Sequence, residues 1–241
     1  VYPIIRNLIV KLEKQAVQLI YANVDTLKVL GSAIAKRDSD TDAHNYRVTY
    51  YAVALAEAMD LPEKEIADLV VGAFLHDVGK IGIPDCILLK PGKLTAEEFE
   101  VMKSHSLLGT EIVAGNHWLA GAAQTIRHHH ERFDGAGYPD GLRGAAIPRI
   151  ARVFAVVDVF DALTSKRPYK EPMTLAEALS VIEKDAGQHF DPVVVAAFIK
   201  IAPGLYAKAV QVGDAELRQG MRTLLSRYFK TETAPKMEPP S

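Results

Sequence analysis

The chain has 241 residues, of which 49% are hydrophobic, and its 28 lysines and arginines nearly balance its 30 aspartates and glutamates. A chain of this composition can bury a core, which excludes a disordered protein, and its near-neutral charge argues against binding to polymeric nucleic acid. The single cysteine, Cys86, excludes a disulfide framework and a cysteine-based zinc site, and it fits a cytoplasmic location. No apolar run approaches the roughly 18 residues of a membrane span, so none is predicted.

The first predicted element is a long amphipathic helix. Apolar residues recur at helical spacing from Ile4 to Leu27 with no proline between them. Such a helix packs against its own domain, connects that domain to a preceding one, or pairs with a second copy of itself. Because the chain begins at Val1 rather than at methionine, we expect residues 1–31 to be a linker from an upstream sensory domain, and a homodimer to form through this helix.

Further helices are predicted along the rest of the chain. One spans about residues 43–59, and the next begins at Pro62 and ends near Gly79. The valine-rich run 152–160 could be a buried strand on its local pattern, but nothing nearby alternates like a sheet partner, so we interpret it as a helix. Later helix starts are marked by capping residues, which are the capping boxes Thr95–Glu98 and Thr174–Glu177 and the pair Asp191-Pro192.

Glycines and prolines mark the loops. Residues 79–93 are predicted to form one loop, and residues 133–148 form a second, which at that length we expect to be functional. A helix is expected over Asp214–Tyr228 and a disordered tail from about Thr231. Since helices are predicted throughout and no sheet pattern appears, the predicted fold class is all-α.

The chemistry of the chain is concentrated in histidines and carboxylates. Five of the eight histidines lie between His105 and His130. His76 and Asp77 come at the end of an apolar helix, where a charged carboxylate is costly to bury without a partner. Asp158 raises the same question, because it interrupts a run of valines and phenylalanines. A hydrogen-bonded His–Asp pair in the core also satisfies the first pattern, so that pair alone does not establish a metal site.

Other positions add donors from distant segments. Asp40 and His44 are four residues apart, so in a helix they share a face and could hold one ion; if the helix begins after Asp42, Asp40 lies in a loop instead. His105 is expected on the helix that follows the Thr95 capping box. Together with the run 128–131, these residues form a mixed imidazole and carboxylate set, which suits Fe, Mn, Ni or Zn better than Ca or Mg. The alternative interpretation is a set of core histidines that hold no metal.

Taken in order, the motifs resemble those of the HD-GYP family of the HD superfamily, whose members are metal-dependent cyclic-dinucleotide phosphodiesterases. The resemblance covers about residues 32–198, and several linked motifs in family order make it specific. It implies an HD-superfamily helical bundle over residues 32–203, preceded by the N-terminal helix and followed by a C-terminal helix and tail over residues 204–241. The matching segments are Leu75–Asp85 (LHDVGKIGIPD), Lys103–His105, His129–Glu131, Asp134–Pro139, Asp158–Ser165 (DVFDALTS) and Arg167–Lys170 (RPYK).

The resemblance also implies roles for individual residues. Asp77 would be shared between two ions, and Asp40 stands where some members carry a glutamate that binds a third metal; because aspartate is shorter, we expect two ions. Fe or Mn is expected first, with Ni, Co or Zn as alternatives. The family's metal-ligand positions are occupied by His44, His76, Asp77, His105, His129, His130 and Asp158. Its substrate-binding positions, which hold phosphates and bases, are occupied by Lys80, Tyr138, Arg167 and Lys170.

The activity that the resemblance implies is hydrolysis of cyclic di-GMP to the linear dinucleotide pGpG, with slower cleavage to GMP. A hydroxide bridging the two ions would attack the phosphorus in line, with Asp77 holding the ions and Lys80 binding phosphate or assisting the leaving oxygen. Nothing in the sequence separates guanine from adenine, so a cyclic GMP-AMP phosphodiesterase is an alternative. A non-catalytic cyclic-dinucleotide receptor is an alternative from outside the enzyme class.

Other polar residues are assigned structural roles. His117, His128 and His189 match no ligand position, and we expect them on the surface or in packing contacts. Asp161 and Glu131 are expected to support the ligands from behind, Glu131 by fixing an imidazole.

Overall fold

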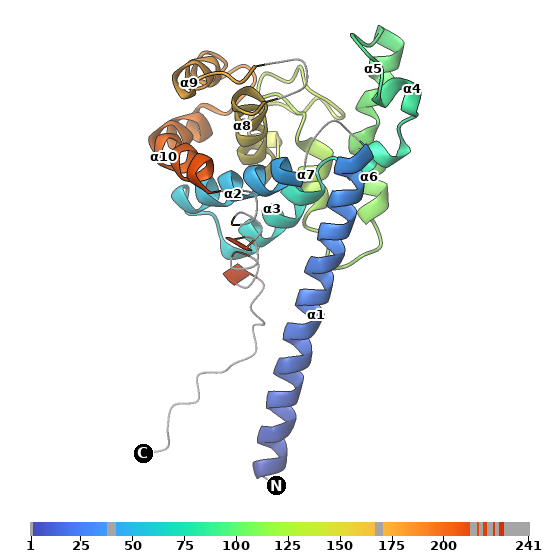
Figure 1. The fold of residues 1–241 in the computed structure, drawn as a ribbon, viewed down its shortest axis with the longest axis vertical. Helices are drawn as coiled ribbons and strands as arrows, with labels where there is room; N and C mark the ends of the chain where they lie inside the picture. Colours follow the sequence, from blue (N-terminus) through green and yellow to red (C-terminus); the bar gives the residue numbers. More distant parts are fainter. Residues whose placement is uncertain are drawn as a thin grey trace.

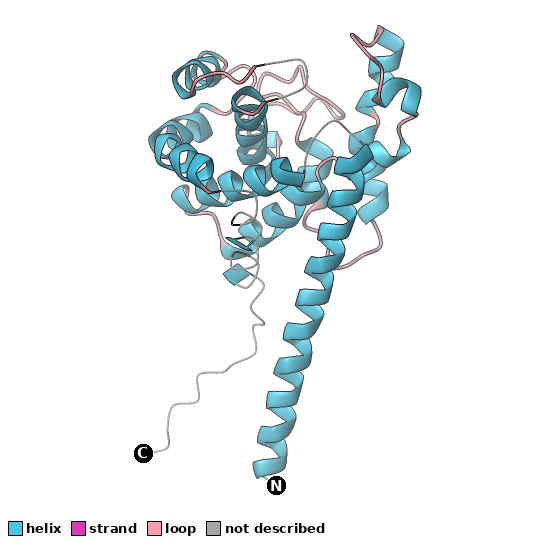
Figure 2. Ribbon diagram, in the orientation of Figure 1, coloured by secondary structure: helices cyan, strands magenta, loops and turns pink. Residues whose placement is uncertain are grey.

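The computed structural model describes residues 2–37, 42–166 and 171–212, with a few isolated residues between 216 and 228. Within these residues every named element is helical, which confirms the predicted all-α class (Figure 2). The predictions that lie outside the described residues concern Asp40, Arg167, Lys170, the greater part of the helix expected over Asp214–Tyr228 and the tail from Thr231.

The first element, α1 (Tyr2–Arg37), is one long helix whose N-terminal half projects from the body of the molecule (Figure 1). Its C-terminal part is buried through Leu27 and Ile34. Gly31 lies so close to Phe74 that a Cβ atom there would come within 2.6 Å of the ring. The described part of the chain leaves the upstream apolar side chains uncovered, and these are Ile4, Ile5, Leu8, Ile9, Leu12 and Leu19.

The body is built on α2 (Asp42–Ala58), α3 (Glu63–Leu75) and α8 (Arg149–Thr164), which pack on one another. Apolar residues fill most of α8, and this run is a helix, as predicted. The helices α9 (Leu175–Lys184) and α10 (Pro192–Gln211) lie against α8, and α10 also contacts α2 (Figure 1). The largest fully buried side chains of this core include Tyr51, Leu55, Leu69, Phe154, Phe160 and Phe198.

The predicted caps are present at all three helix starts. Thr95 and Thr174 each complete a capping box, before α5 (Ala96–Lys103) and α9 respectively. Asp191 accepts a hydrogen bond from a backbone N–H in the first turn of α10. These local signals are confirmed because each satisfies backbone donors that a first helical turn leaves without partners.

One break in the chain falls where the sequence predicts a continuous helix. Ser104 separates α5 from α6 (His105–Val113), so His105 begins a helix of its own rather than lying on the helix of the Thr95 capping box. The remaining short elements are α7 (Ala123–His128) and η2 (Gly144–Ala146), the latter inside the predicted loop 133–148.

The segment after α3 also differs from the prediction. α3 ends at Leu75 rather than near Gly79, and the predicted loop 79–93 contains η1 (Val78–Gly82) and α4 (Asp85–Leu88). The physical reason is close packing, since a Cβ atom at Gly79 would come within 1.8 Å of a backbone oxygen of α6. The tight 3₁₀ turn therefore brings the end of α3 directly against the start of α6.

One described helix, α10, is long and apolar enough to cross a membrane by length and composition. The helix was expected from its Asp191-Pro192 start but not as a candidate span, because Lys200 and Lys208 interrupt its apolar residues. Val194, Phe198 and Ala202 form a buried face of α10, and the helix packs on α2, α8 and α9. In this structure α10 is therefore an outer helix of the bundle.

The last residue of α1 ties that helix to the segment around η1. The Arg37 guanidinium donates hydrogen bonds to backbone carbonyls of η1 and to a carboxylate at the start of α4. The acceptors are the carbonyl oxygens of Lys80 (3.0 Å), Ile81 and Ile83 (2.7 Å) and the carboxylate of Asp85 (2.8 Å). One side chain thus fixes the path of the chain between α3 and α4.

We expect Arg37→Ala to lower the free energy of unfolding by about 1–2 kcal/mol, because several partly buried carbonyl oxygens lose a charged donor. Urea unfolding measures the change. Arg6→Ala is the matched control, since Arg6 lies on the same helix and is exposed, and it should leave the midpoint unchanged. Equal midpoints for the two variants would contradict the assigned role of Arg37.

Candidate metal centre

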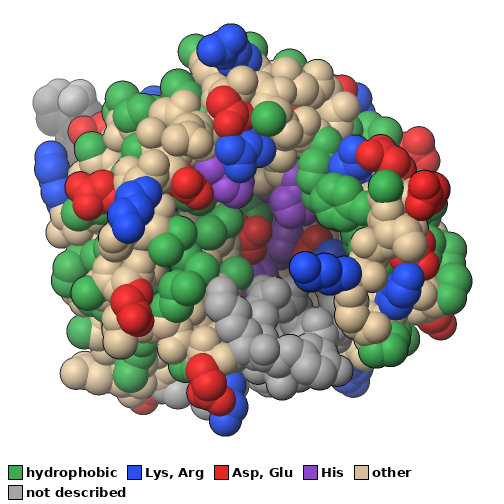
Figure 3. Space-filling model, turned by 90° about the horizontal axis from the view of Figure 1, so that it is seen from above, with side chains coloured by type: hydrophobic (Ala, Val, Ile, Leu, Met, Phe, Trp, Pro, Cys, Tyr) green, Lys and Arg blue, Asp and Glu red, His purple; other side chains and the backbone are tan. Residues whose placement is uncertain are grey.

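Six of the predicted ligand residues form two groups. Within each group the potential ligand atoms all lie within 4.8 Å of one another. Histidine side chains are visible at the floor of a hollow, with carboxylates beside them and basic side chains near its rim (Figure 3). The first group is His105, His129 and His130, and the second is His44, His76 and Asp158.

Asp77 lies between the two groups. Its Oδ2 atom is 3.1 Å from Nε2 of His76, and its Oδ1 atom is 3.6 Å from Nε2 of His105. Each carboxylate oxygen thus faces a different group. This position follows from the early end of α3, because the turn after Leu75 directs Asp77 toward the start of α6. The structure therefore brings together all the predicted ligand residues that it describes.

Three imidazoles are oriented by the same type of hydrogen bond to the backbone. Nδ1 of His76, His105 and His129 each lies 2.7–2.9 Å from the carbonyl oxygen of the residue three positions earlier. A carbonyl oxygen only accepts hydrogen bonds, so Nδ1 of each ring must carry the proton. A neutral ring in this tautomer carries its lone pair on Nε2, which is the form in which histidine binds a metal.

His44 is oriented by a side chain instead. Its Nδ1 atom donates to Oδ2 of Asp161 at 2.8 Å, while its Nε2 atom lies 3.5 Å from Asp158. Arg47 donates to both oxygens of Asp161, at 2.6 and 2.9 Å. Burial favours the protonated acid, but hydrogen bonds from His44 and Arg47 outweigh it and lower the pKa of Asp161 to about 2. Asp161 therefore supports a predicted ligand from behind, as expected, and Arg47 is a residue that the sequence analysis missed.

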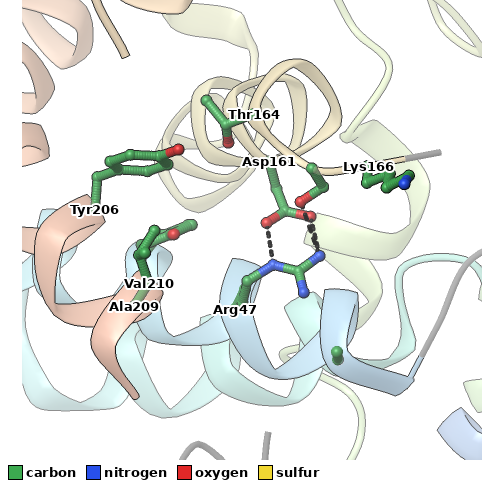
Figure 4. Close-up of a pocket in the computed structure, with 10 residues that line it drawn as sticks. Arg47, Asp161, Thr164, Lys166, Tyr206, Ala209 and Val210 are labelled. Atoms are coloured by element: carbon green, nitrogen blue, oxygen red, sulfur yellow. Dashed lines mark hydrogen bonds and ion pairs between the residues drawn. The ribbon is translucent and has the colours of Figure 1, made fainter. Parts of the chain in front are cut away.

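A pocket of about 360 Å³ opens beside this carboxylate. Figure 4 shows Arg47 of α2 facing Asp161 of α8, with Tyr206 of α10 also lining the pocket. None of the seven predicted metal-ligand residues described by the structure lines it. The pocket therefore lies next to the histidine groups, and its lining residue Asp161 contacts His44.

The charge states differ between the groups. Burial lowers the pKa of His105, His129 and His130, and neighbouring imidazoles lower it further. Burial also opposes the protonation of His76, but the adjacent Asp77 and Asp158 carboxylates outweigh it and raise its pKa to about 9. The first group is thus neutral and able to bind a cation, whereas in the second group His76 is protonated and would have to release the proton on Nε2 to bind one.

The donor chemistry fits a divalent metal. Nε2 of His105 and Nε2 of His129 lie 3.3 Å apart, and both carry lone pairs because their Nδ1 atoms donate elsewhere. Two lone pairs at this distance repel each other, and a cation bound between them removes the repulsion. Imidazole with carboxylate is also the donor set of Fe, Mn, Co, Ni and Zn. The site is therefore a candidate for divalent metal binding on its own geometry.

Two predicted substrate-binding residues border the site. Nζ of Lys80 donates to Asp77 Oδ2 at 2.7 Å. Tyr138 lies on the loop after α7, with its ring 4.7 Å from that of His130. A glycine is required at position 137, because a Cβ atom there would come within 2.2 Å of the backbone nitrogen of Arg132. The loop that the glycines and prolines predicted thus holds Tyr138 against the first histidine group.

The expectation for Glu131 is wrong. Its oxygens accept backbone N–H groups of Asp140 and Leu142 at 2.8 and 3.0 Å, so it shapes the loop and fixes none of the ligand imidazoles. His128, Glu131 and Asp140 form a third group of potential ligand atoms. In this group Asp140 already has a partner, because Arg127 donates to both of its oxygens at 2.7 Å.

The other two histidines that match no ligand position have the packing and surface places expected of them. His117 is exposed, and His189 stacks on the ring of Phe190 with centroids 4.3 Å apart.

A family model of the HD domain matches residues 28–194. Three relatives are similar over 73–82% of the chain: a cyclic di-GMP phosphodiesterase response regulator, RpfG, of Xanthomonas campestris (45% identity), a cyclic di-GMP phosphodiesterase of Thermotoga maritima (44%) and a 3'3'-cGAMP-specific phosphodiesterase of Vibrio cholerae (41%). The chain spans 53%, 49% and 35% of their respective lengths.

Solved structures share the fold. A cyclic GMP-AMP specific phosphodiesterase of V. cholerae superposes over 87% of this chain and 54% of its own, with a TM-score of 0.58 and 18% identity. An HDGYP protein of Bdellovibrio bacteriovorus superposes over 79% of this chain and 62% of its own, with a TM-score of 0.56 and 22% identity. At these identities the likeness concerns the helical architecture alone.

We expect Asp161→Asn to weaken divalent metal binding about 10- to 100-fold. A carboxamide can donate to Nδ1 of His44, which would move the imidazole proton to Nε2 and block that atom as a ligand. Calorimetric titration of the metal-free protein with Mn²⁺ measures the affinity. Asp134→Asn is the matched control, because Asp134 pairs with Arg132 outside the site. Unchanged Mn²⁺ affinity in the Asp161 variant would remove its role in orienting His44.

Proposed function

The chain belongs to the HD domain family, in its HD-GYP branch, and we propose that it is a metal-dependent phosphodiesterase that hydrolyses cyclic di-GMP to pGpG. The observation that carries the proposal is the position of Asp77, which faces one group of nitrogen and oxygen donors with each carboxylate oxygen. A site that presents two donor groups on either side of a shared carboxylate suits two-metal hydrolysis of a phosphate ester. Curated relatives that bear cyclic di-GMP phosphodiesterase names support the choice of substrate.

We propose that His105, His129 and His130 hold one divalent ion, that His44, His76 and Asp158 hold the other, and that Asp77 contacts both. When bound, such ions supply Lewis acidity and a water molecule whose pKa is lowered toward neutrality. Fe or Mn is proposed, with Ni, Co or Zn as alternatives, because cellular supply decides among metals that accept the same donors. A third ion at Asp40 is not part of the proposal.

The chain's own residues would position the phosphodiester. Lys80 presents a positive charge beside Asp77, where it would bind a non-bridging phosphate oxygen or donate a proton to the leaving sugar oxygen. Arg167 would bind the second phosphate with two hydrogen bonds, and Lys170 would add a point charge. Tyr138 would contact a base. Burial raises the pKa of the Tyr138 phenol, so the group stays neutral and can donate a hydrogen bond.

Two alternatives are kept. Relatives named as cGAMP-specific phosphodiesterases, such as that of V. cholerae, favour a mixed cyclic dinucleotide as the second candidate substrate. A receptor without turnover is the other alternative, and it is disfavoured because binding alone has no need for the facing ligand nitrogens. Turnover of cyclic di-GMP and cyclic GMP-AMP in parallel separates all three.

We also propose that residues 1–31 connect this domain to an upstream sensory domain, and that the protein acts in the cytoplasm as a homodimer. The exposed apolar side chains of α1 support the dimer. Leu8, Leu12 and Leu19 are each more than half exposed, and their spacing of four and seven residues follows the repeat of a two-helix coiled coil.

Activity is tested on protein loaded with Fe²⁺ or Mn²⁺ without oxygen, with cyclic di-GMP and its products separated by chromatography. We expect pGpG to accumulate, and His105→Ala to lower the rate at least about 100-fold because the first histidine group loses one of its three donors. His117→Ala is the matched control, since His117 is exposed, and it should keep full activity and metal content. Full activity of the His105 variant without bound metal would refute the two-metal proposal.

For the dimer, we expect Leu12→Lys combined with Leu19→Lys to give a monomer, because the lysines of the two copies would face each other where the apolar side chains of α1 are proposed to pack. Sedimentation velocity at several concentrations measures the change. Gln18→Lys adds the same charge at another exposed position of α1 and should leave the dimer intact. A monomeric unmodified protein at all concentrations would count against pairing through α1.

A further inference from the structure

A series of aromatic rings leads from the buried histidines to the surface. The ring of Tyr138 is tilted against His130, with centroids 4.7 Å apart. Phe99 of α5 meets Tyr138 edge to face, with centroids 6.2 Å apart. Phe99 is 46% exposed, although a phenylalanine is normally among the most buried residues. The series thus ends in an apolar ring face that solvent reaches, on the side of the site formed by α5.

A basic side chain accompanies the two outer rings. Nζ of Lys103 lies 5.7 Å from the centroid of Phe99 and 5.8 Å from that of Tyr138. Its ion-pair partner, Glu100, is 69% exposed on its side chain, so water screens that pair. Rings beside a cation, next to a centre suited to phosphate chemistry, offer a stacking face for a base and a charge for its phosphate.

The helix that carries Phe99 and Lys103 is held at both ends, although α5 buries none of its residues. The capping box formed by Thr95 and Glu98 fixes the first turn of α5, and Lys90 also pairs with Glu98. At the other end, one residue separates Lys103 from His105, the first residue of α6 and a member of the first histidine group. The helix that presents Phe99 is therefore joined directly to the first histidine group.

We propose that Phe99 and Lys103 form an outer base-binding subsite, in which a purine of the cyclic dinucleotide stacks on Phe99 and Lys103 contacts the adjoining phosphate. Tyr138 would bound the same base on the inner side. The subsite rests on the proposed function, since it adds a contact with a base of the same substrate. Packing alone does not explain the exposed ring of Phe99, because no residue of α5 is buried.

The test compares Phe99→Ala with Val101→Ala, a control on the same helix with 39% exposure. For cyclic di-GMP we expect the Phe99 variant to raise KM about 10- to 100-fold with kcat unchanged. The inhibition constant of inorganic phosphate, which has no base, should stay the same. Phe99→Tyr should restore KM, and Lys103→Gln should raise KM most at low salt.

A binding measurement supplies a second readout. In a protein that carries Phe99→Trp and Trp118→Phe, stacking of a purine should quench the fluorescence of the introduced indole, whereas inorganic phosphate should not. An unchanged KM in Phe99→Ala, or an equal loss in kcat and in phosphate affinity, overturns the subsite and leaves the phosphodiesterase proposal standing. No turnover of any cyclic dinucleotide by the metal-loaded unmodified protein overturns the proposed function, and the subsite with it.

Discussion

The site depends on hydrogen bonds that hold the outer nitrogen of each buried imidazole. In His76, His105 and His129, a carbonyl oxygen of the preceding helical turn accepts from Nδ1, and in His44 the acceptor is Asp161. Nε2 is therefore the atom that His105 and His129 can offer to a metal in the first group, and that His44 and His76 can offer in the second. Without these acceptors a neutral imidazole could take its other tautomer, and the donors would no longer point together. The orientation of the helices thus determines the chemistry of the site.

Much of this arrangement could be predicted from the sequence, for identifiable physical reasons. The capping boxes at Thr95 and Thr174 were predictable because they are local, and α8 because no sheet partner was available for its valines. His76, Asp77 and Asp158 stood out because a charged or polar side chain in an apolar segment needs a partner, whereas the other candidate ligands were assigned through the resemblance to the HD-GYP family. The end of α3 was missed because it depends on the contact of Gly79 with α6, a segment about 25 residues away.

The contacts that orient the candidate ligand residues were harder to predict from the sequence. A carbonyl oxygen three residues before a histidine belongs to any residue type, so no motif marks it. Arg47 lies three residues after His44, on a helix that the sequence predicted, but its bidentate contact with Asp161 links α2 to α8 and appears only in three dimensions. Glu131 was assigned to an imidazole because of its place beside His129 and His130, whereas its carboxylate turns to backbone donors of the loop.

Helix α8 shows how stability and chemistry are combined in one element. Most of its residues belong to the core, yet two carboxylates one turn apart, Asp158 and Asp161, enter the same interior. Burying them opposes folding unless each finds positive charge. Asp161 finds it in Arg47, a partner within the chain, and it is ionised in the folded protein. Asp158 faces His44 and raises the pKa of His76, so its charge is met by imidazoles among the residues that the structure describes. The apolar helices therefore stabilise a site whose carboxylates are paired with a protonated imidazole and with Lys80, and a divalent cation that took the place of these partners would bind the same carboxylates.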